Sequence, residues 1–277
     1  MYLSGENKFS WISGSELFLI ITMPIKKRLN KVSSYSSLAS VYDRLMSHVE
    51  YDEWADLINK ISRRYIKKKK ISIFEIGGGT GSLAKLLIHS GYNYYGSDLS
   101  PHMCREAAQK KIPFFCADCR ALPLKKSFDL VIFLYDGINY LPRLDHYSIL
   151  FDQVYQCLNP GGYFLFDITT ETNSIRHFFE YLDFEDYNDY SMVRHSYYDE
   201  EKTLQYNDFT IFKLTNEKPD LYEKFSERHI QKVLPPKLIE EAVPRNLFRI
   251  IGIWDGFSER KYSIRSERIH FLLKKIV

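Results

Sequence analysis

The stretch ISIFEIGGGTGSLAKLLIH, residues 71–89, decides which fold the chain is expected to adopt. It begins as an apolar strand, breaks into glycines after Ile76, and continues with the apolar spacing of a helix from Ser82. Glycines at the end of a strand let the backbone turn tightly and approach a ligand with no Cβ in the way. In an open α/β sheet, ligands bind outside the carboxyl ends of the strands. The stretch therefore predicts the first unit of an α/β sheet, with a binding site at residues 75–81.

The spacing of the glycines discriminates between two classes of ligand. A dinucleotide fingerprint has glycines at its first, third and sixth positions, but Ser82 occupies the sixth position counted from Gly77. The glycines at 77, 79 and 81 follow a first-third-fifth pattern instead. A nicotinamide-dependent oxidoreductase is therefore disfavoured. A glycine-rich turn by itself could also be an ordinary connection between a strand and a helix.

The alternation of strands and helices continues to about residue 168. Residues 130–134 are continuously apolar, which is typical of a central parallel strand that is buried on both faces. Residues 146–158 have helical spacing, and the Asn-Pro-Gly-Gly sequence at 159–162 is expected to form a turn. This pattern predicts a doubly wound, Rossmann-like α/β fold with a seven-stranded, mostly parallel sheet. Its expected strands in this part are 71–76, 92–97, 114–116, 130–134 and 163–168.

After residue 170 the pattern changes. Residues 192–198, 203–214 and 222–233 alternate polar and apolar side chains, as antiparallel strands do. Strands at 248–254 and 269–273 are expected to rejoin the main sheet. We therefore expect four parts, which are an N-terminal extension over 1–33 that need not be ordered, a core over 34–170, a small inserted antiparallel lid or substrate segment over 171–233, and a C-terminal helix with strands over 234–277.

Polar side chains follow the successive strands of the predicted core. Asp98 ends the second strand, where a carboxylate can accept hydrogen bonds from both hydroxyls of a ribose. Asp118 follows the third strand, where a carboxylate could accept a hydrogen bond from the exocyclic amine of an adenine. Tyr135 and Asp136 follow the fourth. Each acid alone could be a solvated loop residue, but together they converge on one crevice.

These residues resemble the motif series of the class I S-adenosylmethionine-dependent methyltransferases. The resemblance covers roughly residues 35–170, and residues 35–54 look similar to a bacterial branch that acts on small molecules. It implies an enzyme that uses S-adenosyl-L-methionine and releases S-adenosyl-L-homocysteine. The residues that carry it are Glu75-x-Gly77-x-Gly79-x-Gly81, Asp98, Asp118, Phe128-Asp129-Leu130-Val131 and Leu158-Asn159-Pro160-Gly161-Gly162.

The resemblance also implies which residues bind the cofactor. Asp98 would hold the ribose, Asp118 would contact the adenine edge, and Tyr135 would lie beside the sulfonium. Tyr35 would close over the carboxylate of the cofactor, and Glu75 would border its amino group. The full implied set is Tyr35, Glu75, Gly77, Gly78, Gly79, Gly81, Asp98, Leu99, Met103, Asp118, Cys119 and Tyr135.

The methyl acceptor is expected to be a nitrogen or oxygen of a small molecule. Methyl transfer is an in-line displacement in which the cofactor brings the reactivity, so the protein needs no nucleophile of its own. Enzymes that methylate DNA amino groups resemble each other in an Asn/Asp-Pro-Pro-aromatic motif, whereas this chain has Tyr135-Asp136-Gly137-Ile138. No Pro-Cys dipeptide of the RNA cytosine-C5 enzymes occurs. The alternatives that stay open are a noncatalytic S-adenosylmethionine-binding or assembly protein, an RNA methyltransferase and an NAD-dependent oxidoreductase.

Three residues are the candidates for catalysis. Asp136 and Asn139 follow the fourth strand, whose end would fix them near the transferred methyl group. His195 could act as a general base if the acceptor must lose a proton, and His229 is a similar candidate. A surface histidine with an ordinary partner is the alternative for each.

Composition narrows the remaining classes of protein. The chain has 277 residues, 45% hydrophobic and 26% charged, which is typical of a globular protein. A net charge of +3 does not predict nucleic-acid binding, and the longest apolar run, residues 17–23, is shorter than the ~20 residues of a membrane span. The Cys116-x-x-Cys119 pair lacks partners for a metal site. We expect a cytoplasmic monomer or homodimer without a metal, a membrane or a nucleic-acid partner.

Overall fold

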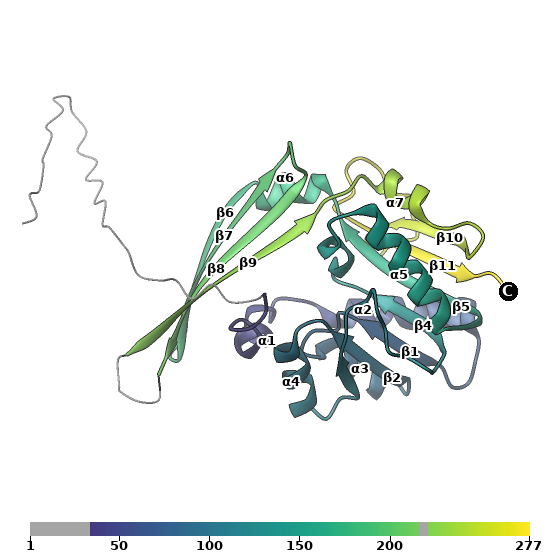
Figure 1. Ribbon diagram of the computed structural model, residues 1–277, viewed down its shortest axis with the longest axis horizontal. Coiled ribbons are helices and arrows are strands. Elements are labelled where there is room, and N and C mark those ends of the chain that lie inside the picture. The colour runs from purple at the N-terminus through teal and green to yellow at the C-terminus, as the bar shows by residue number, and fades with distance from the viewer. Residues whose placement is uncertain (1–33, 216–220) are drawn as a thin grey trace, which may run out of the picture.

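The computed structural model describes residues 34–215 and 221–277, so the expected extension over 1–33 lies outside the described residues. The described chain forms a seven-stranded sheet and a separate four-stranded sheet. Figure 1 shows the four-stranded sheet, in green, extending away from the layered core. No helix in the described ranges is long and apolar enough to cross a membrane.

The seven-stranded sheet has the order β10-β11-β5-β4-β1-β2-β3. Only β11 runs against its neighbours, because it pairs in antiparallel fashion with both β5 and β10. The expected doubly wound, mostly parallel sheet is therefore confirmed. The strand order reverses between β1 and β4, and ligands bind at such a switch point. The strands are β1 (Ser72–Ile76), β2 (Asn93–Asp98), β3 (Phe114–Cys116), β4 (Phe128–Phe133), β5 (Leu158–Thr169), β10 (Phe248–Asp255) and β11 (Arg268–Lys275).

Helices cover both faces of this sheet. Leu130 and Ile132 of β4 pack with α2 and α3 on one face, whereas Val131 and Phe133 pack with α5 and α7 on the other. This alternation explains why the strand is apolar at every position. The helices are η1 (Ala39–Val41), α1 (Tyr42–Leu45), α2 (Tyr51–Ile61), η2 (Ser62–Ile66), α3 (Ser82–His89), α4 (Pro101–Gln109), η3 (Gly137–Tyr140), α5 (Leu144–Cys157), α6 (Glu171–Phe178) and α7 (Pro236–Ala242).

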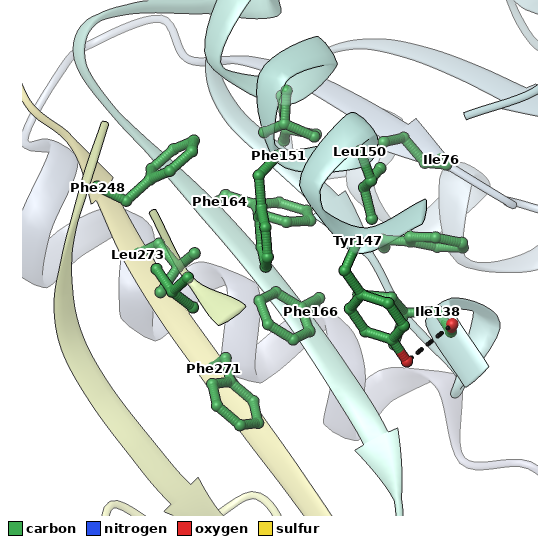
Figure 2. Packing of buried hydrophobic residues seen from close by; sticks show 14 of the residues in the cluster. Ile76, Ile138, Tyr147, Leu150, Phe151, Phe164, Phe166, Phe248, Phe271 and Leu273 are labelled. Atoms are coloured by element: carbon green, nitrogen blue, oxygen red, sulfur yellow. Dashed lines mark hydrogen bonds between the residues drawn. The ribbon is translucent and has the colours of Figure 1, made fainter. Parts of the chain in front are cut away.

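Aromatic residues make up 16% of the chain, and many of them lie in this core. Figure 2 shows Phe151 of α5 against Phe164 and Phe166 of β5, with ring centroids 6.3 and 6.1 Å from that of Phe151. Phe166 stacks on Phe271 of β11 at 4.8 Å. Tyr147 reaches from the same helix and donates a hydrogen bond of 3.3 Å to the Ile138 carbonyl. These rings fix α5 over the strands that end at the predicted site.

The start of β5 differs from the sequence-based prediction. Residues 159–162 were expected to form a turn, but they belong to the strand, which begins at Leu158. Gly161 has a φ of 71°, and the pairing of β5 with β4 shifts register between Phe128 and Leu130. The Asn-Pro-Gly-Gly sequence therefore makes an irregularity within the strand, because a glycine in the left-handed region can bulge a strand without ending it.

The four-stranded sheet, called the antiparallel sheet below, has the order β6-β7-β8-β9. The expected strands over 192–198, 203–214 and 222–233 are confirmed. The preceding helix α6 and strand β6 were not expected. Thr170 caps α6 by accepting a hydrogen bond from the backbone N–H of Asn173. The strands are β6 (Glu180–Asp186), β7 (Tyr190–Asp199), β8 (Leu204–Leu214) and β9 (Tyr222–Lys232).

The N-terminal part of the described chain packs on the antiparallel sheet. Leu38, Val41 and Leu45 form a cluster with buried residues of β7 and β8. The apolar spacing of Leu38, Val41 and Leu45 after the cap candidates Ser33-Ser34 predicts a helix here, and the structure has helical residues only from Ala39 to Leu45. Tyr35 has a φ of 61°, and only the short helices η1 and α1 follow. The segment packs on the face of the antiparallel sheet that contains Tyr190, Met192, Phe209 and Ile211, which is called the inner face below.

Candidate active site

The glycine-rich turn follows β1 as predicted. Gly77, Gly79 and Gly81 have φ values of 65°, 58° and 79°, which residues with a side chain rarely adopt. A Cβ at Gly77 would lie 2.8 Å from Phe133 Cε2. The nearest neighbour of a Cβ at Gly79 would be Tyr42 Cε1 at 3.9 Å. Apart from its chain neighbours, no atom of the described residues lies closer than 3.9 Å to this position, so the backbone of Gly79 is free of close side-chain contacts and a ligand could approach it.

Glu75 is a buried acid beneath this turn. Burial raises its pKa to about 7, although a hydrogen bond donated by the Tyr94 hydroxyl opposes the rise. A Cβ at Gly78 would lie 3.0 Å from Glu75 Oε2 and 2.9 Å from Phe114 Cζ. The carboxyl group of Glu75 thus occupies space that a side chain at position 78 would need. A cationic group beside Glu75 would favour the ionised form.

Asp98 joins the end of β2 to the glycine turn. Its Oδ2 accepts a hydrogen bond of 3.0 Å from the backbone N–H of Gly79, and its Oδ1 accepts one of 2.8 Å from Ser100. Burial raises the pKa of Asp98, and the backbone hydrogen bonds oppose that rise. Each carboxylate oxygen can accept a second hydrogen bond. The ribose contact implied for Asp98 stays a prediction that this geometry allows.

The residues expected near the adenine follow β2 and β3 or, for Met103, lie in the helix α4 after β2. Asp118 Oδ2 forms a 2.6 Å ion pair with Arg120 Nη2, which lowers the pKa of Asp118. Met103 is buried with 1% exposure, whereas Leu99 is 67% exposed. Cys119 is partly buried and packs against the core. The structure brings these residues to one edge, and their contacts with adenine stay predictions.

A cavity of about 280 Å³ lies between the core and the antiparallel sheet. Among the residues predicted from the sequence, Tyr35, Tyr135, Asp136 and His229 line it. The glycine turn, Asp98 and Asp118 do not. The lining residues used below are Tyr35, Tyr135, Asp136, Tyr140, Ser174, Arg194, Gln205, His229 and Arg268.

Tyr135 and Asp136 both adopt left-handed backbone conformations, with φ values of 63° and 49°. Such values are uncommon for residues with a side chain, and the backbone strain that they cause is found mainly at functional sites. Asp136 Oδ1 accepts a 2.9 Å bond from Arg268 Nη2, and Gln231 also donates to this carboxylate. Burial raises the pKa of Asp136, and Arg268 opposes that rise. The catalytic role of Asp136 stays a prediction, and its ion pair holds it at the cavity wall.

Asn139 does not reach the cavity. It is fully buried; its Nδ2 donates to the Lys232 carbonyl at 2.9 Å, and its Oδ1 accepts from the backbone N–H of Thr169 at 3.1 Å. Both ends of the amide are therefore occupied by the backbone of β9 and β5. The structure thus places Asn139 away from the cavity, which does not favour its expected role near the transferred methyl group.

His195 lies on the outer face of the antiparallel sheet. Side chains alternate along β7, so Arg194 faces the cavity while His195 points away from it. His195 Nε2 lies 2.5 Å from Glu180 Oε1, and its side chain is 39% exposed. The structure thus places His195 away from the cavity, which does not favour its expected role as a general base there.

His229 occupies the inner face instead. Its Nδ1 lies 3.1 Å from the Tyr140 hydroxyl, which lies 2.7 Å from the hydroxyl of Tyr35. Its Nε2 lies 3.3 Å from Glu227 Oε2. Four hydrogen-bonding groups thus connect the N-terminal segment, the end of η3 and β9. Tyr140 and Glu227 were not candidates from the sequence. The period-two spacing of Glu227, His229 and Gln231 on one strand could have indicated that Glu227 shares a face with His229.

Burial and hydrogen bonds determine the ionisation states of the groups in this hydrogen-bonded series. Burial raises the pKa of Tyr140, so its hydroxyl stays protonated at neutral pH. Burial also opposes the charge on Glu227. His229 and the backbone N–H groups of Ser37 and Leu38 nevertheless lower the pKa of Glu227 overall. An ionised Glu227 can stabilise a proton on the imidazole of His229.

Comparison with known proteins adds the family. Residues 45–206, more than half of the chain, match a family model described as a methyltransferase domain. The Bacillus subtilis protein named "Putative methyltransferase YqeM" is 29% identical over 247 residues, covering 87% of this chain and 97% of that protein.

Solved structures share the fold. A S-adenosylmethionine-dependent methyltransferase from Clostridium acetobutylicum superposes with a TM-score of 0.74 at 24% identity, covering 88% of this chain and 99% of that chain. The sugar N-methyltransferase KedS8 from a Streptoalloteichus species superposes with a TM-score of 0.70 at 16% identity, covering 98% and 100%. The fold of the present chain is therefore one that these solved structures share over most of their length.

Proposed function

The chain belongs to the family of the methyltransferase domain, and on this premise we propose that it methylates a nitrogen or oxygen atom of a small molecule. The family match confirms the sequence-based interpretation as a methyltransferase. S-adenosylmethionine is the proposed methyl donor, and when bound it supplies an electrophilic methyl group on a sulfonium.

The residues at the end of β1 and β2 fit this donor. The backbone at Gly79 is open on the side of Tyr42, and Asp98 keeps acceptor capacity on both carboxylate oxygens. Glu75 is a buried acid that an ammonium group would ionise. We propose that Asp98 holds the ribose hydroxyls and that Glu75 lies near the amino group.

The observation that carries the proposal is that residues assigned to the methyl donor and residues proposed for the acceptor line one cavity. Tyr35 and Tyr135, which the resemblance assigns to the donor, line the same cavity as Tyr140 and His229. Its volume of about 280 Å³ is near the lower end of the roughly 300–1,000 Å³ that small-molecule sites occupy. The size and the enclosure by two sheets favour a small acceptor over a polymer.

His229 is the proposed general base. An acceptor N–H or O–H can give its proton to the Tyr140 oxygen while the Tyr140 hydroxyl proton passes to His229 Nδ1, 3.1 Å away. Glu227 then stabilises the imidazolium through Nε2. Tyr140 keeps its proton until this exchange, because burial raises the pKa of its hydroxyl. The sugar N-methyltransferase activity named for KedS8 supports a nitrogen acceptor as the first to test.

The test is methyl transfer by the full chain. The protein is incubated with S-adenosylmethionine and either a small-molecule extract or purified RNA, and formation of S-adenosylhomocysteine is measured by mass spectrometry. We expect product only with the small-molecule extract. Product formed only with RNA, or none above the level without acceptor, would contradict the proposal.

A further inference from the structure

We propose that the cavity accepts a small acid, whose anionic group is held by Arg194 and whose amino or hydroxyl group donates a hydrogen bond to Gln205 on the neighbouring strand. This inference rests on the proposed function, because it takes the cavity as the site of the methyl acceptor.

The hydrogen bonds of Arg194 leave most of its donors for a ligand. Its Nε donates to Ser196 Oγ at 3.0 Å, and its Nη2 donates to Asn207 Oδ1 at 2.9 Å. Both partners are neutral oxygens. A guanidinium has five N–H donors in a planar fork that matches a carboxylate or a phosphate. Within residues 34–215 and 221–277, two of these donors are engaged, and the side chain lines the cavity.

The charge of Arg194 has no carboxylate partner within ion-pair distance in the described chain. Arg268, the other guanidinium of the cavity, pairs with both Asp136 and Asp167. The guanidinium of Arg194 instead lies 5.1 Å from the ring centre of Phe178. Burial lowers the pKa of Arg194, so the surroundings disfavour its charge. An anion in the cavity would relieve this cost.

The same sheet also presents a hydrogen-bond acceptor, because Gln205 of β8 pairs with Tyr198, four positions along β7 from Arg194 and on the same face. Gln205 is 2% exposed, and its Nε2, which carries two N–H donors, lies 3.4, 3.2 and 3.1 Å from the carbonyl oxygens of Phe178, Tyr197 and Tyr206. These three carbonyls fix the orientation of the amide. Gln205 Oε1 and the hydroxyl of Ser174 are buried and have no hydrogen-bond partner among the described residues. Both residues line the cavity.

Arg194 and Gln205 together define the ligand class. Arg194 supplies donors and a positive charge, whereas Gln205 supplies an acceptor. A neutral apolar amine could donate to Gln205 but would leave Arg194 without an anion, and a buried polar group without a partner costs about 1–3 kcal/mol. A small molecule with an anion at one end and an N–H or O–H at the other satisfies both. The carboxylate of the methyl donor itself is the rival partner for Arg194.

The experiment follows the Nε–Hε NMR signal of Arg194 in the full chain saturated with S-adenosylhomocysteine. The probes are acetate, inorganic phosphate and neutral acetamide at constant ionic strength. We expect a saturable shift with acetate or phosphate and none with acetamide, and the tighter anion identifies carboxylate or phosphate as the group. Arg194→Gln, monitored through the ring signals of Tyr140 and His229, should weaken this anion binding by about ten-fold or more.

The controls separate this inference from the proposed function. Arg228→Gln lies on the outer face of the same sheet, where Arg228 pairs with Asp208, and it should leave the shift unchanged. No saturable shift of the Arg194 signal in the unaltered chain would overturn the inference, and so would unchanged anion affinity of Arg194→Gln measured through the ring signals of Tyr140 and His229. Competition between the anion and S-adenosylhomocysteine, or a ten-fold weaker affinity of Arg194→Gln for that product, would assign Arg194 to the donor. Failure of the unaltered chain to bind S-adenosylhomocysteine would instead contradict the proposed function.

Discussion

Asp98 has two tasks at the residue scale, since it fixes Gly79 and Ser100 and is proposed to hold a ribose. Asp98→Ala removes an acceptor for two hydroxyls and should cost on the order of 2–3 kcal/mol, or about 30- to 150-fold in cofactor affinity. Calorimetry with S-adenosylhomocysteine measures this loss, and thermal unfolding shows whether the turn survives. An unchanged dissociation constant would mean that the ribose lies elsewhere.

Glu227 is expected to stabilise the folded chain. Its carboxylate accepts hydrogen bonds from the backbone N–H groups of Tyr35, Ser37 and Leu38. Glu227→Gln should therefore lower the free energy of unfolding by about 1–3 kcal/mol at pH 7. Denaturant unfolding measures the difference, with the exposed Glu223→Gln on the same strand as a control that should change little.

The pH dependence of this effect has a definite sign. The pKa of Glu227 in the folded chain lies below its ordinary value of 4.5. Its contribution is then fully present above pH 4.5 and disappears as the pH falls through the folded-state pKa. Glu227→Gln should remove this part of the acid sensitivity. Equal acid profiles for the two proteins would show that Glu227 is not held in the ionised form.

His229 and His195 form a matched pair for testing the general base. If His229 takes the proton of the acceptor, His229→Gln should lower kcat by about 10²- to 10⁴-fold while cofactor affinity stays the same. His195→Gln on the outer face should leave kcat unchanged. The measurement is steady-state methyl transfer once an acceptor is known, and a loss in His195→Gln alone would reverse the assignment.

At the scale of elements, the antiparallel sheet is the part that we propose as a lid and acceptor-binding segment. Deletion of 171–233, with the flanks joined by a Gly/Ser linker, should leave cofactor binding, because the glycine turn and Asp98 belong to core strands. Affinity should fall somewhat, since Tyr35 loses its docking on Glu227. Methyl transfer should be abolished. A folded deletion protein that binds no cofactor would mean that the sheet builds the cofactor site.

The strands of this sheet could be predicted, but the face that each residue occupies could not. Alternation gives the period of two, yet it does not say whether Arg194 or His195 faces inward, because both are polar. The N-terminal segment decides this by packing Leu38 against the inner face. Strand β6 was missed because it is an edge strand whose Leu182 and Phe184 are exposed, which hides the pattern of a half-buried strand.

For the whole molecule, the glycine turn and the apolar strand 130–134 were enough to predict the doubly wound sheet. Strand ends also indicated Asp98 and Asp136, since parallel strands bring them to one edge. The acceptor side of the site was beyond the sequence, because Tyr35, Tyr140 and His229 are distant along the chain and meet only when the antiparallel sheet folds against the core. Local patterns give no information on such long-range contacts.

The central claim is that the glycine turn after β1 binds the S-adenosyl group of the methyl donor. Calorimetry of the full chain with S-adenosylmethionine, S-adenosylhomocysteine and NAD tests it most directly. The account predicts saturable binding of both sulfur ligands at one site per chain and no binding of NAD, because the glycines lie at 77, 79 and 81. Binding of NAD with no response to either sulfur ligand would contradict it.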